Sequence, residues 1–228
     1  MQTRQLQLLN LVIDSYIKTA EPIGSRFLLA KGKLDVGEAT VRNDLRALED
    51  DGYLTHPHTS AGRIPTEKGY LAYLADLDMS KAKLSKKDND VFGMCLKDKG
   101  ITNKEQSDKE LVKALAELSD ETVILAFSPD KVYYTGLSNL FSKPEFQELQ
   151  LVADVSQIFD HCEDCLKTFF DNVGAEPKYF VGAEHSFGNA LSVLAFRFGD
   201  DSLLALLGPM RMNYARNFGL VNKVKELL

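Results

Sequence analysis

The chain has 228 residues, with 27 lysines and arginines against 33 aspartates and glutamates, and so a formal net charge of −6. A hydrophobic fraction of 44% and a charged fraction of 26% exclude a disordered chain and allow two modest folded domains. No basic segment followed by an apolar core begins the chain, and no apolar run approaches the roughly 18 residues that span a bilayer. We therefore expect no secretory signal and no membrane association. Three cysteines without a disulfide pattern favour a cytoplasmic protein.

The acidic balance is uneven along the chain. Residues 1–75 contain nine basic and nine acidic residues, whereas the remainder contains 18 basic and 24 acidic residues. A protein that reads DNA needs a local basic face rather than a basic chain. The charge therefore permits DNA binding by the N-terminal part but does not by itself indicate it.

The first 78 residues have the pattern of three helices, a hairpin and a further helix. Apolar residues at helical spacing predict the first helix, with Thr3 as its cap, and Pro22 and Gly32 predict the ends of the segments that follow. The expected elements are helices over 3–18, 25–31 and 38–51, short strands over 53–56 and 63–65, and a helix over 66–78. This is the order of a winged helix-turn-helix.

The rest of the chain predicts a mixed α/β domain after a connection. Residues 79–90 are rich in lysine and are expected to form a linker, and a helix is expected over 90–99. Further helices are expected over 108–119, most of 143–172 and 213–228, and strands over 122–127, 131–136, 178–182, 190–198 and 202–207. The segment 190–198 also fits a helix. No internal repeat is visible.

The third helix carries the pattern with the most information about function. Val41, Leu45 and Leu48 recur at one face and are expected to be buried. The opposite face presents small and polar residues, namely Ala39, Asn43, Arg46 and Ala47, flanked by Thr40 and Arg42. Small residues allow close approach to a groove, and Asn and Arg can form bidentate pairs with adenine and guanine. Any amphipathic helix has a polar face, so the preceding helix and the following wing are what favour DNA reading.

Two other segments are candidates for contact with the DNA backbone. The hairpin loop contains His58, Thr59, Ser60 and Arg63, and an arginine at a wing tip can enter a minor groove. A solvated turn is the alternative, and the two histidines of this loop are too few for a metal site. Gly24-Ser25-Arg26 begins the second helix and offers backbone N–H groups, a hydroxyl and a guanidinium to a phosphate. Alternatively, Ser25 is only a cap and Arg26 is solvated.

Several of these segments resemble one known family. They are Glu21-Pro22-Ile23-Gly24-Ser25-Arg26, Ala39-Thr40-Val41-Arg42-Asn43-Asp44-Leu45, Gly52-Tyr53-Leu54 and Pro57-His58-Thr59-Ser60-Ala61-Gly62-Arg63-Ile64-Pro65-Thr66. Gly136-Leu137-Ser138-Asn139-Leu140-Phe141, Pro144-Glu145-Phe146 and Gly208-Pro209-Met210-Arg211-Met212-Asn213-Tyr214 extend the match. Together these segments resemble the HrcA-type heat-inducible transcription repressors.

The resemblance implies a fold and a function. Such repressors bind, as dimers, an inverted-repeat operator upstream of chaperone operons and release it on heat shock. Their second domain is GAF-like and carries an inserted dimerisation segment, and a chaperonin is their usual activity partner. This chain would then be a homodimer that binds double-stranded DNA and has a chaperonin as a further partner.

The chain departs from the family pattern at two places. Gly37-Glu38 stands where the family usually has Ser-Pro, and a carboxylate there would repel phosphate, which predicts an altered half-site preference. The family also has a long stretch between the positions of Pro129 and Gly136, where this chain has room only for a tight turn. The second domain is therefore expected to be reduced, with an altered dimer mode.

Other function classes have weaker support. His161 and the Cys162-Glu-Asp-Cys165 run form a metal-like cluster, but a lone C-x-x-C in a helical stretch is more often a pair of packed thiols. No phosphate loop, dinucleotide fingerprint or nucleophile elbow is present, so we expect no enzyme, no cofactor and no catalytic residue. A ligand-responsive regulator, whose GAF-like domain senses a small molecule, remains the alternative function, and a protein-docking module is a third.

The sequence thus predicts an α+β protein with an N-terminal winged helix-turn-helix and a reduced GAF-like α/β domain. The expected domains are residues 1–78 for DNA binding, 79–107 as linker and helical connection, and 108–228 for effector response and dimerisation. The expected DNA contacts are Ser25, Arg26, Thr40, Arg42, Asn43, Arg46, His58, Thr59, Ser60 and Arg63.

Overall fold

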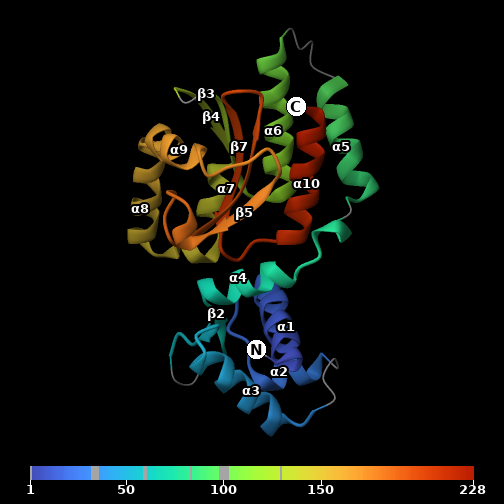
Figure 1. Cartoon of the computed structure of the whole chain (residues 1–228), viewed down its shortest axis with the longest axis vertical. Coiled ribbons are helices and arrows are strands. Elements are labelled where there is room, and N and C mark those ends of the chain that lie inside the picture. The colour runs from blue at the N-terminus through green and yellow to red at the C-terminus, as the bar shows by residue number, and fades with distance from the viewer. Residues whose placement is uncertain (1, 32–35, 59–60, 83, 98–102, 129) are drawn as a thin grey trace. The chain divides into compact units, whose positions relative to one another are not determined.

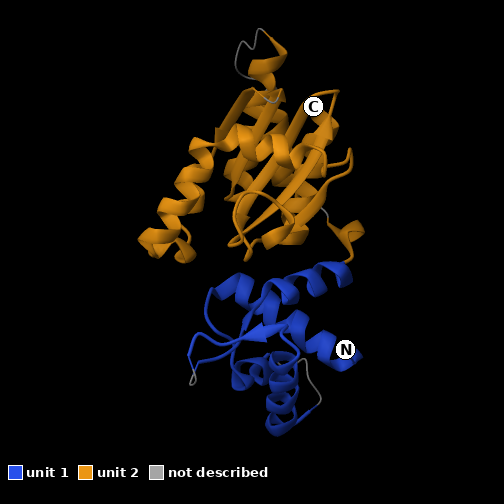
Figure 2. Ribbon diagram, turned by 60° about the vertical axis from the view of Figure 1, so that its left-hand side comes forward, with its two compact units in different colours: residues 1–77 blue, residues 78–228 orange. Residues whose placement is uncertain are grey.

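The computed structural model describes residues 2–31, 36–58, 61–82, 84–97, 103–128 and 130–228. It divides into two compact units, residues 1–77 and residues 78–228, which Figure 2 shows in different colours. Each unit has its own core. In the described part of the chain, no helix is both long and apolar enough to cross a membrane.

The described residues of unit 1 form the helices α1 to α4 and a two-stranded wing (Figure 1). Its elements are α1 (Thr3–Thr19), α2 (Ser25–Ala30), α3 (Glu38–Asp50), β1 (Leu54–Thr55), β2 (Ile64–Pro65) and α4 (Glu67–Asp76). The helices expected from periodicity are all present, with ends within two residues of the prediction. The expectation that Thr3 caps α1 is wrong, because Gln2 is the cap residue and Thr3 is already helical. Gly32, expected to close the second helix, lies outside the described residues.

The core of unit 1 is formed by the apolar faces of α1, α2, α3 and α4. Leu9, Val12, Leu28 and Leu48 are almost completely inaccessible to solvent. Burial of such side chains contributes about 1.5–3 kcal/mol each, which is more than helix propensity supplies to helices of this length. Packing of these faces therefore fixes the orientation of α3.

Unit 2 begins with a short helical turn and two helices, followed by the first hairpin of a sheet. These elements are η1 (Met79–Lys81), α5 (Lys86–Lys97), α6 (Lys104–Ser119), β3 (Thr122–Ser128) and β4 (Lys131–Thr135). Then follow α7 (Leu137–Phe141), η2 (Pro144–Gln147), α8 (Leu149–Asp160), α9 (Cys162–Phe170), β5 (Lys178–Val181), η3 (Gly182–Glu184), β6 (Leu191–Phe198), β7 (Ser202–Pro209) and α10 (Tyr214–Leu227). The segment 190–198, for which a helix was the alternative, is strand β6.

The five strands form one antiparallel sheet in the order β4-β3-β7-β6-β5. Helices α5, α6 and α10 lie on one side of it and α7, α8 and α9 on the other (Figure 1). Successive side chains of a strand point to opposite faces, so Ile124 and Ala126 face α7–α9 while Val123 and Leu125 face the other side. Coverage of both faces explains why β3, β6 and β7 are nearly continuous apolar runs.

The segment 79–107, expected as a linker and helical connection, contributes α5 to unit 2. Phe92 of α5 is buried, α5 packs on α6, and Asp88 pairs with Arg216 of α10 at 3.1 Å. The lysine-rich composition concealed this because Asp88 pairs with Arg216, which lies far along the chain.

Candidate nucleic-acid interface

Helix α3 presents the expected polar face to solvent. Val41, Leu45 and Leu48 are buried, whereas Arg42 and Asn43 are exposed. Ala39 and Arg46 are exposed on the same face, and Thr40 and Ala47 are half-buried. The helix therefore has one anchored side and one side whose guanidinium and amide groups are accessible to a macromolecule.

A half-buried ion pair anchors α3 to α1. Arg4 donates two hydrogen bonds to Asp44, from Nε to Oδ2 at 2.8 Å and from Nη2 to Oδ1 at 3.0 Å. Asp44 is buried, and this geometry favours the charged form of Arg4, so its pKa is raised. Sequence reasoning missed this pair; the available signal was an acidic residue on the apolar side of α3.

A groove of about 640 Å³ runs between α3, the start of α2 and the base of the wing. The residues that line it are Ile23, Gly24, Ser25, Arg42, Asn43, Leu45, Arg46, Ala61, Gly62 and Arg63. Three of these described residues are arginines and none is acidic. A shallower hollow, lined by Glu38, Ala39, Arg42 and Asn43, adjoins it on α3. The groove is thus a positively charged recess of a kind that suits a nucleic-acid backbone.

The carboxylate of Glu38, in the first turn of α3, lies close to three of the predicted contact residues. Its Oε1 lies 2.6 Å from Arg42 Nη2, 3.6 Å from Arg26 Nε and 3.4 Å from the Ser25 hydroxyl. Partial desolvation opposes ionisation of Glu38, but hydrogen bonding and charge attraction from Arg42 and Arg26 hold its pKa below the ordinary value. The carboxylate that departs from the family pattern is therefore the partner of both arginines in the unbound chain.

The prediction that Arg63 lies at the wing tip is wrong. Its backbone forms a bridge with Ile23, with N–H to O distances of 2.9 and 2.8 Å, which places it at the wing base. Its side chain is 26% exposed and pairs with Glu49 of α3 at 2.7 Å. His56 also contacts Glu49. The place of Arg63 in the hairpin loop led us to expect a side chain that reaches the DNA, but pairing with Glu49 turns it back onto α3.

Gly62 makes this close packing of the wing base possible. A Cβ atom at this position would lie 2.6 Å from the backbone carbonyl carbon atoms of Pro22 and Ile23. Backbone atoms cannot move aside as a flexible side chain can, so any larger residue would push the wing from the turn before α2. Gly62 therefore fixes the distance between the two walls of the groove.

The structure brings together five of the ten predicted contact residues. Ser25, Arg42, Asn43, Arg46 and Arg63 line the groove, and Arg26 joins them through Glu38. Thr40 is half-buried and does not line the groove. His58 is exposed in the wing loop, and Thr59 and Ser60 lie outside the described residues.

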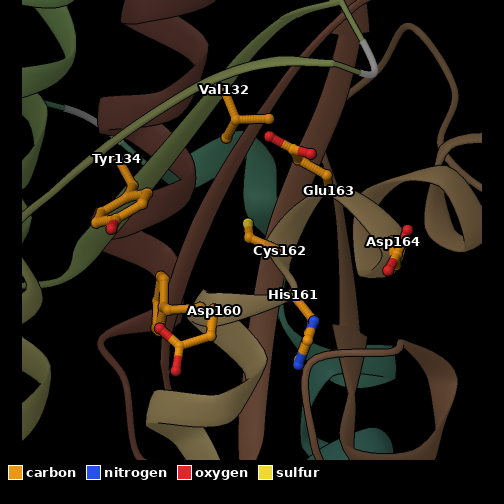
Figure 3. Close-up of a pocket in the computed structure, with 8 residues that line it drawn as sticks. Val132, Tyr134, Asp160, His161, Cys162, Glu163 and Asp164 are labelled. Carbon is orange, nitrogen blue, oxygen red and sulfur yellow. The ribbon is translucent and has the colours of Figure 1, made fainter.

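Unit 2 has a pocket of about 250 Å³ between β4 and the junction of α8 and α9 (Figure 3). Its lining includes Asp160, His161, Glu163 and Asp164. This volume falls below the range of about 300–1,000 Å³ typical of small-molecule sites, and the carboxylates give it a polar wall. The pocket does not supply a specific argument for a ligand-sensing domain.

The Cys162-x-x-Cys165 run is packed rather than assembled as a metal centre. Cys162 is buried in the core of unit 2, and burial raises the pKa of its thiol to about 12. Its sulfur and the ring of His161 point in different directions (Figure 3). Across the described residues, no group of three or more His, Cys, Asp and Glu side chains is arranged to hold a metal ion.

Glu121 is a buried carboxylic acid where the segments 136–146 and 208–214 meet. It is 3% exposed, lies 3.9 Å from Lys143 Nζ, and its carbonyl oxygen accepts a hydrogen bond from Asn139. Glu145 and Arg211 join the two segments through a 2.6 Å ion pair. Burial raises the pKa of Glu121 to about 8, against the opposing charge of Lys143. This acid is therefore uncharged over much of the physiological pH range.

The fold of unit 1 defines a winged-helix protein with a basic groove. Residues 12–72 match the Ribonuclease R winged-helix domain model, in agreement with that fold. Residues 78–217 match the HrcA protein C terminal domain model. The chain belongs to the HrcA family, and the expected fold class, with its reduced GAF-like second domain, is confirmed.

Two relatives and one solved structure illustrate the extent of the likeness. A heat-inducible transcription repressor HrcA from Bifidobacterium animalis subsp. lactis is 60% identical over 75 residues, which are 33% of this chain and 20% of that protein. The HrcA repressor of Thermodesulfovibrio yellowstonii is 27% identical, over 97% of this chain and 95% of that protein. A crystal structure of a hypothetical protein covers the whole chain and 97% of its own, with a TM-score of 0.82 and 18% identity, and shows the fold alone.

The longer alignment also shows that this chain is shorter than that relative. It extends over 332 positions although this chain has only 228 residues, so a long stretch of that relative has no counterpart here. In this chain β3 and β4 pair directly as a hairpin, with Ser128 opposite Lys131. This direct pairing of β3 with β4 falls where the sequence led us to expect the shortening.

Proposed function

We propose that this protein is a transcription repressor of heat-shock genes and that unit 1 reads its operator. The observation that carries the proposal is the exposed face of α3, where Arg42, Asn43 and Arg46 border a groove without acidic lining residues. Relatives over the same winged-helix segment are named heat-inducible transcription repressors, which supports the assignment. Asn43 and Arg46 read base edges, while Ser25, Arg26 and Arg42 contact phosphates. His58, Thr59 and Ser60 of the wing are further candidates for backbone contact.

Selection of bound duplexes from a random pool is the experiment that tests this function. We expect one enriched half-site that occurs as an inverted repeat, because two symmetric units bind two half-sites. Recovery of no enriched sequence would contradict a sequence-specific repressor. The family resemblance adds that the operator precedes chaperone genes.

Asn43→Ala is expected to relax base preference at one position of each half-site. Loss of a bidentate amide–base pair reduces discrimination at that position by about 1–3 kcal/mol. Binding of the variant to duplexes carrying each base at each position measures the effect. Equal loss of affinity on operator and random DNA would mean that Asn43 contacts only phosphate.

We further propose that the chain acts as a homodimer held by unit 2. One winged-helix unit covers few base pairs, so useful specificity requires two. Unit 2 exposes large apolar side chains that suit such a contact: Tyr134 on β4 is 43% exposed and Leu149 on α8 is 86% exposed. Light scattering at micromolar protein is expected to give twice the mass of one chain. A monomer both with and without operator would contradict the dimer.

Heating is proposed to release the protein from its operator. The sequence resemblance places the missing stretch of this chain in unit 2, and a smaller domain has a smaller margin of stability. Partial unfolding of unit 2 on heating would separate the two DNA-reading units. A chaperonin that recognises the exposed apolar strands would restore the DNA-binding fraction.

A further inference from the structure

The carboxylate of Glu38 lies among groups that the proposed function assigns to the DNA backbone. Arg42 Nη2 is 2.6 Å from Glu38 Oε1, Arg26 Nε is 3.6 Å from the same oxygen, and the Ser25 hydroxyl is 3.4 Å from it. Arg42 Nε is also 3.4 Å from the Ser25 hydroxyl. One anionic oxygen thus stands at the centre of two guanidinium groups and one hydroxyl.

These three partners are the groups that a backbone phosphate uses. Guanidinium groups bind the oxygens of carboxylates and phosphates in the same way, through charge-assisted N–H donors, and a hydroxyl donates to either anion. The Arg26 and Arg42 side chains are 86% and 62% exposed, so a duplex can reach them. The side chain of Glu38 is itself 37% exposed, which leaves it room to swing away.

We propose that Glu38 takes the place of a DNA phosphate in the unbound chain and so determines the strength of backbone binding. The inference rests on the proposed function. On binding, a phosphate displaces the carboxylate from Arg42 and Arg26. The free energy that this exchange costs is the same for every DNA sequence. Base reading is separate, because Asn43 and Arg46 lie more than one turn farther along α3.

Glu38→Gln removes the competing charge while keeping the shape of the side chain. Affinity for a selected operator and for a random duplex of equal length is expected to rise by a similar factor, about 3- to 10-fold. The slope of log K against log salt should become steeper by up to about one unit, because both arginines are then free to neutralise phosphate. Discrimination between the two duplexes should stay unchanged.

Two controls separate this effect from a general change of charge. Asp50→Asn removes the same charge at the far end of α3, where Asp50 is exposed, and is expected to change affinity far less. In an Arg42→Ala background, Glu38→Gln should produce less than half of its original gain, because its main partner is absent.

The outcomes are distinct. Unchanged or weaker binding by the Glu38→Gln chain, or the same gain with Arg42→Ala or from Asp50→Asn, would overturn the inference while leaving the repressor function standing. Equal binding of all duplexes by the wild-type chain would instead contradict the proposed function. A gain on the operator alone would also overturn the inference, because it would place Glu38 at a base edge.

Discussion

The Glu121→Gln variant is expected to melt at nearly the same temperature from pH 5 to pH 9, whereas the wild-type unit 2 should become less stable as the pH rises. Burial raises the pKa of Glu121 in the folded chain to about 8, and the unfolded chain ionises near the ordinary value of 4.5. Between these values the folded state binds more protons than the unfolded state, so the free energy of unfolding falls with rising pH. The stabilisation is complete below about pH 4.5 and is lost by the time the pH passes 8.

The expected loss is a few kcal/mol, because one pKa unit corresponds to about 1.4 kcal/mol. For a unit of this size, each kcal/mol changes the melting temperature by roughly 2–4 °C. Thermal melts followed by circular dichroism over this pH range measure it. Asp120→Asn serves as the control, since Asp120 is an exposed neighbour that also pairs with Lys143. If the Gln variant and the wild-type chain keep parallel pH profiles, Glu121 is ionised in the folded state and this account is wrong.

The second large effect concerns the temperature at which DNA is released. If heat acts by melting unit 2, any change that stabilises unit 2 must raise the release temperature by the same amount. At pH 8.5 the Glu121→Gln chain should therefore hold an operator duplex several degrees above the wild-type chain. Fluorescence anisotropy of labelled operator during heating, compared with the melt of the same sample, provides the measurement.

A folded-state switch would give a different result. In that case the variant would melt later than the wild-type chain but release the operator at the same temperature. Release well below any melting transition, in either chain, would also show that unfolding is not the trigger. Because Glu121 lies in unit 2 and outside the DNA-reading residues, the variant should leave operator affinity at 20 °C unchanged.

The spacing of apolar residues and the positions of turn residues predicted most of the helices and strands, because these signals lie within each element. The spacing of Val41, Leu45 and Leu48 located α3 to within one residue of its end, and turn residues located the wing. Alternation was of little use in unit 2, where both faces of the sheet are covered, yet the length of the apolar runs still indicated strands. For the same reason, 190–198 fitted both a strand and a helix until its pairing with β5 and β7 was known.

The features that escaped prediction depend on partners distant in the sequence. Arg63 looked free because Glu49 is fourteen positions earlier and on another element. The 40-residue separation of Arg4 and Asp44 likewise hides their ion pair. Glu121 reads as an ordinary charged residue, and only the packing of β7, α7 and α10 around it reveals a buried acid.

Glu49 has a consequence for attempts to change which operator the protein reads. Glu49 contacts both His56 and Arg63, so its side chain joins the last turns of α3 to the wing. A recognition surface transplanted from another winged-helix protein by exchanging only Ala39, Asn43 and Arg46 would keep this connection and inherit the wing's present position. A transplant that also replaced Glu49 would remove the partner of Arg63 and leave its positive charge at the groove uncompensated. Redesign of the DNA sequence preference would therefore have to exchange α3 and the wing together.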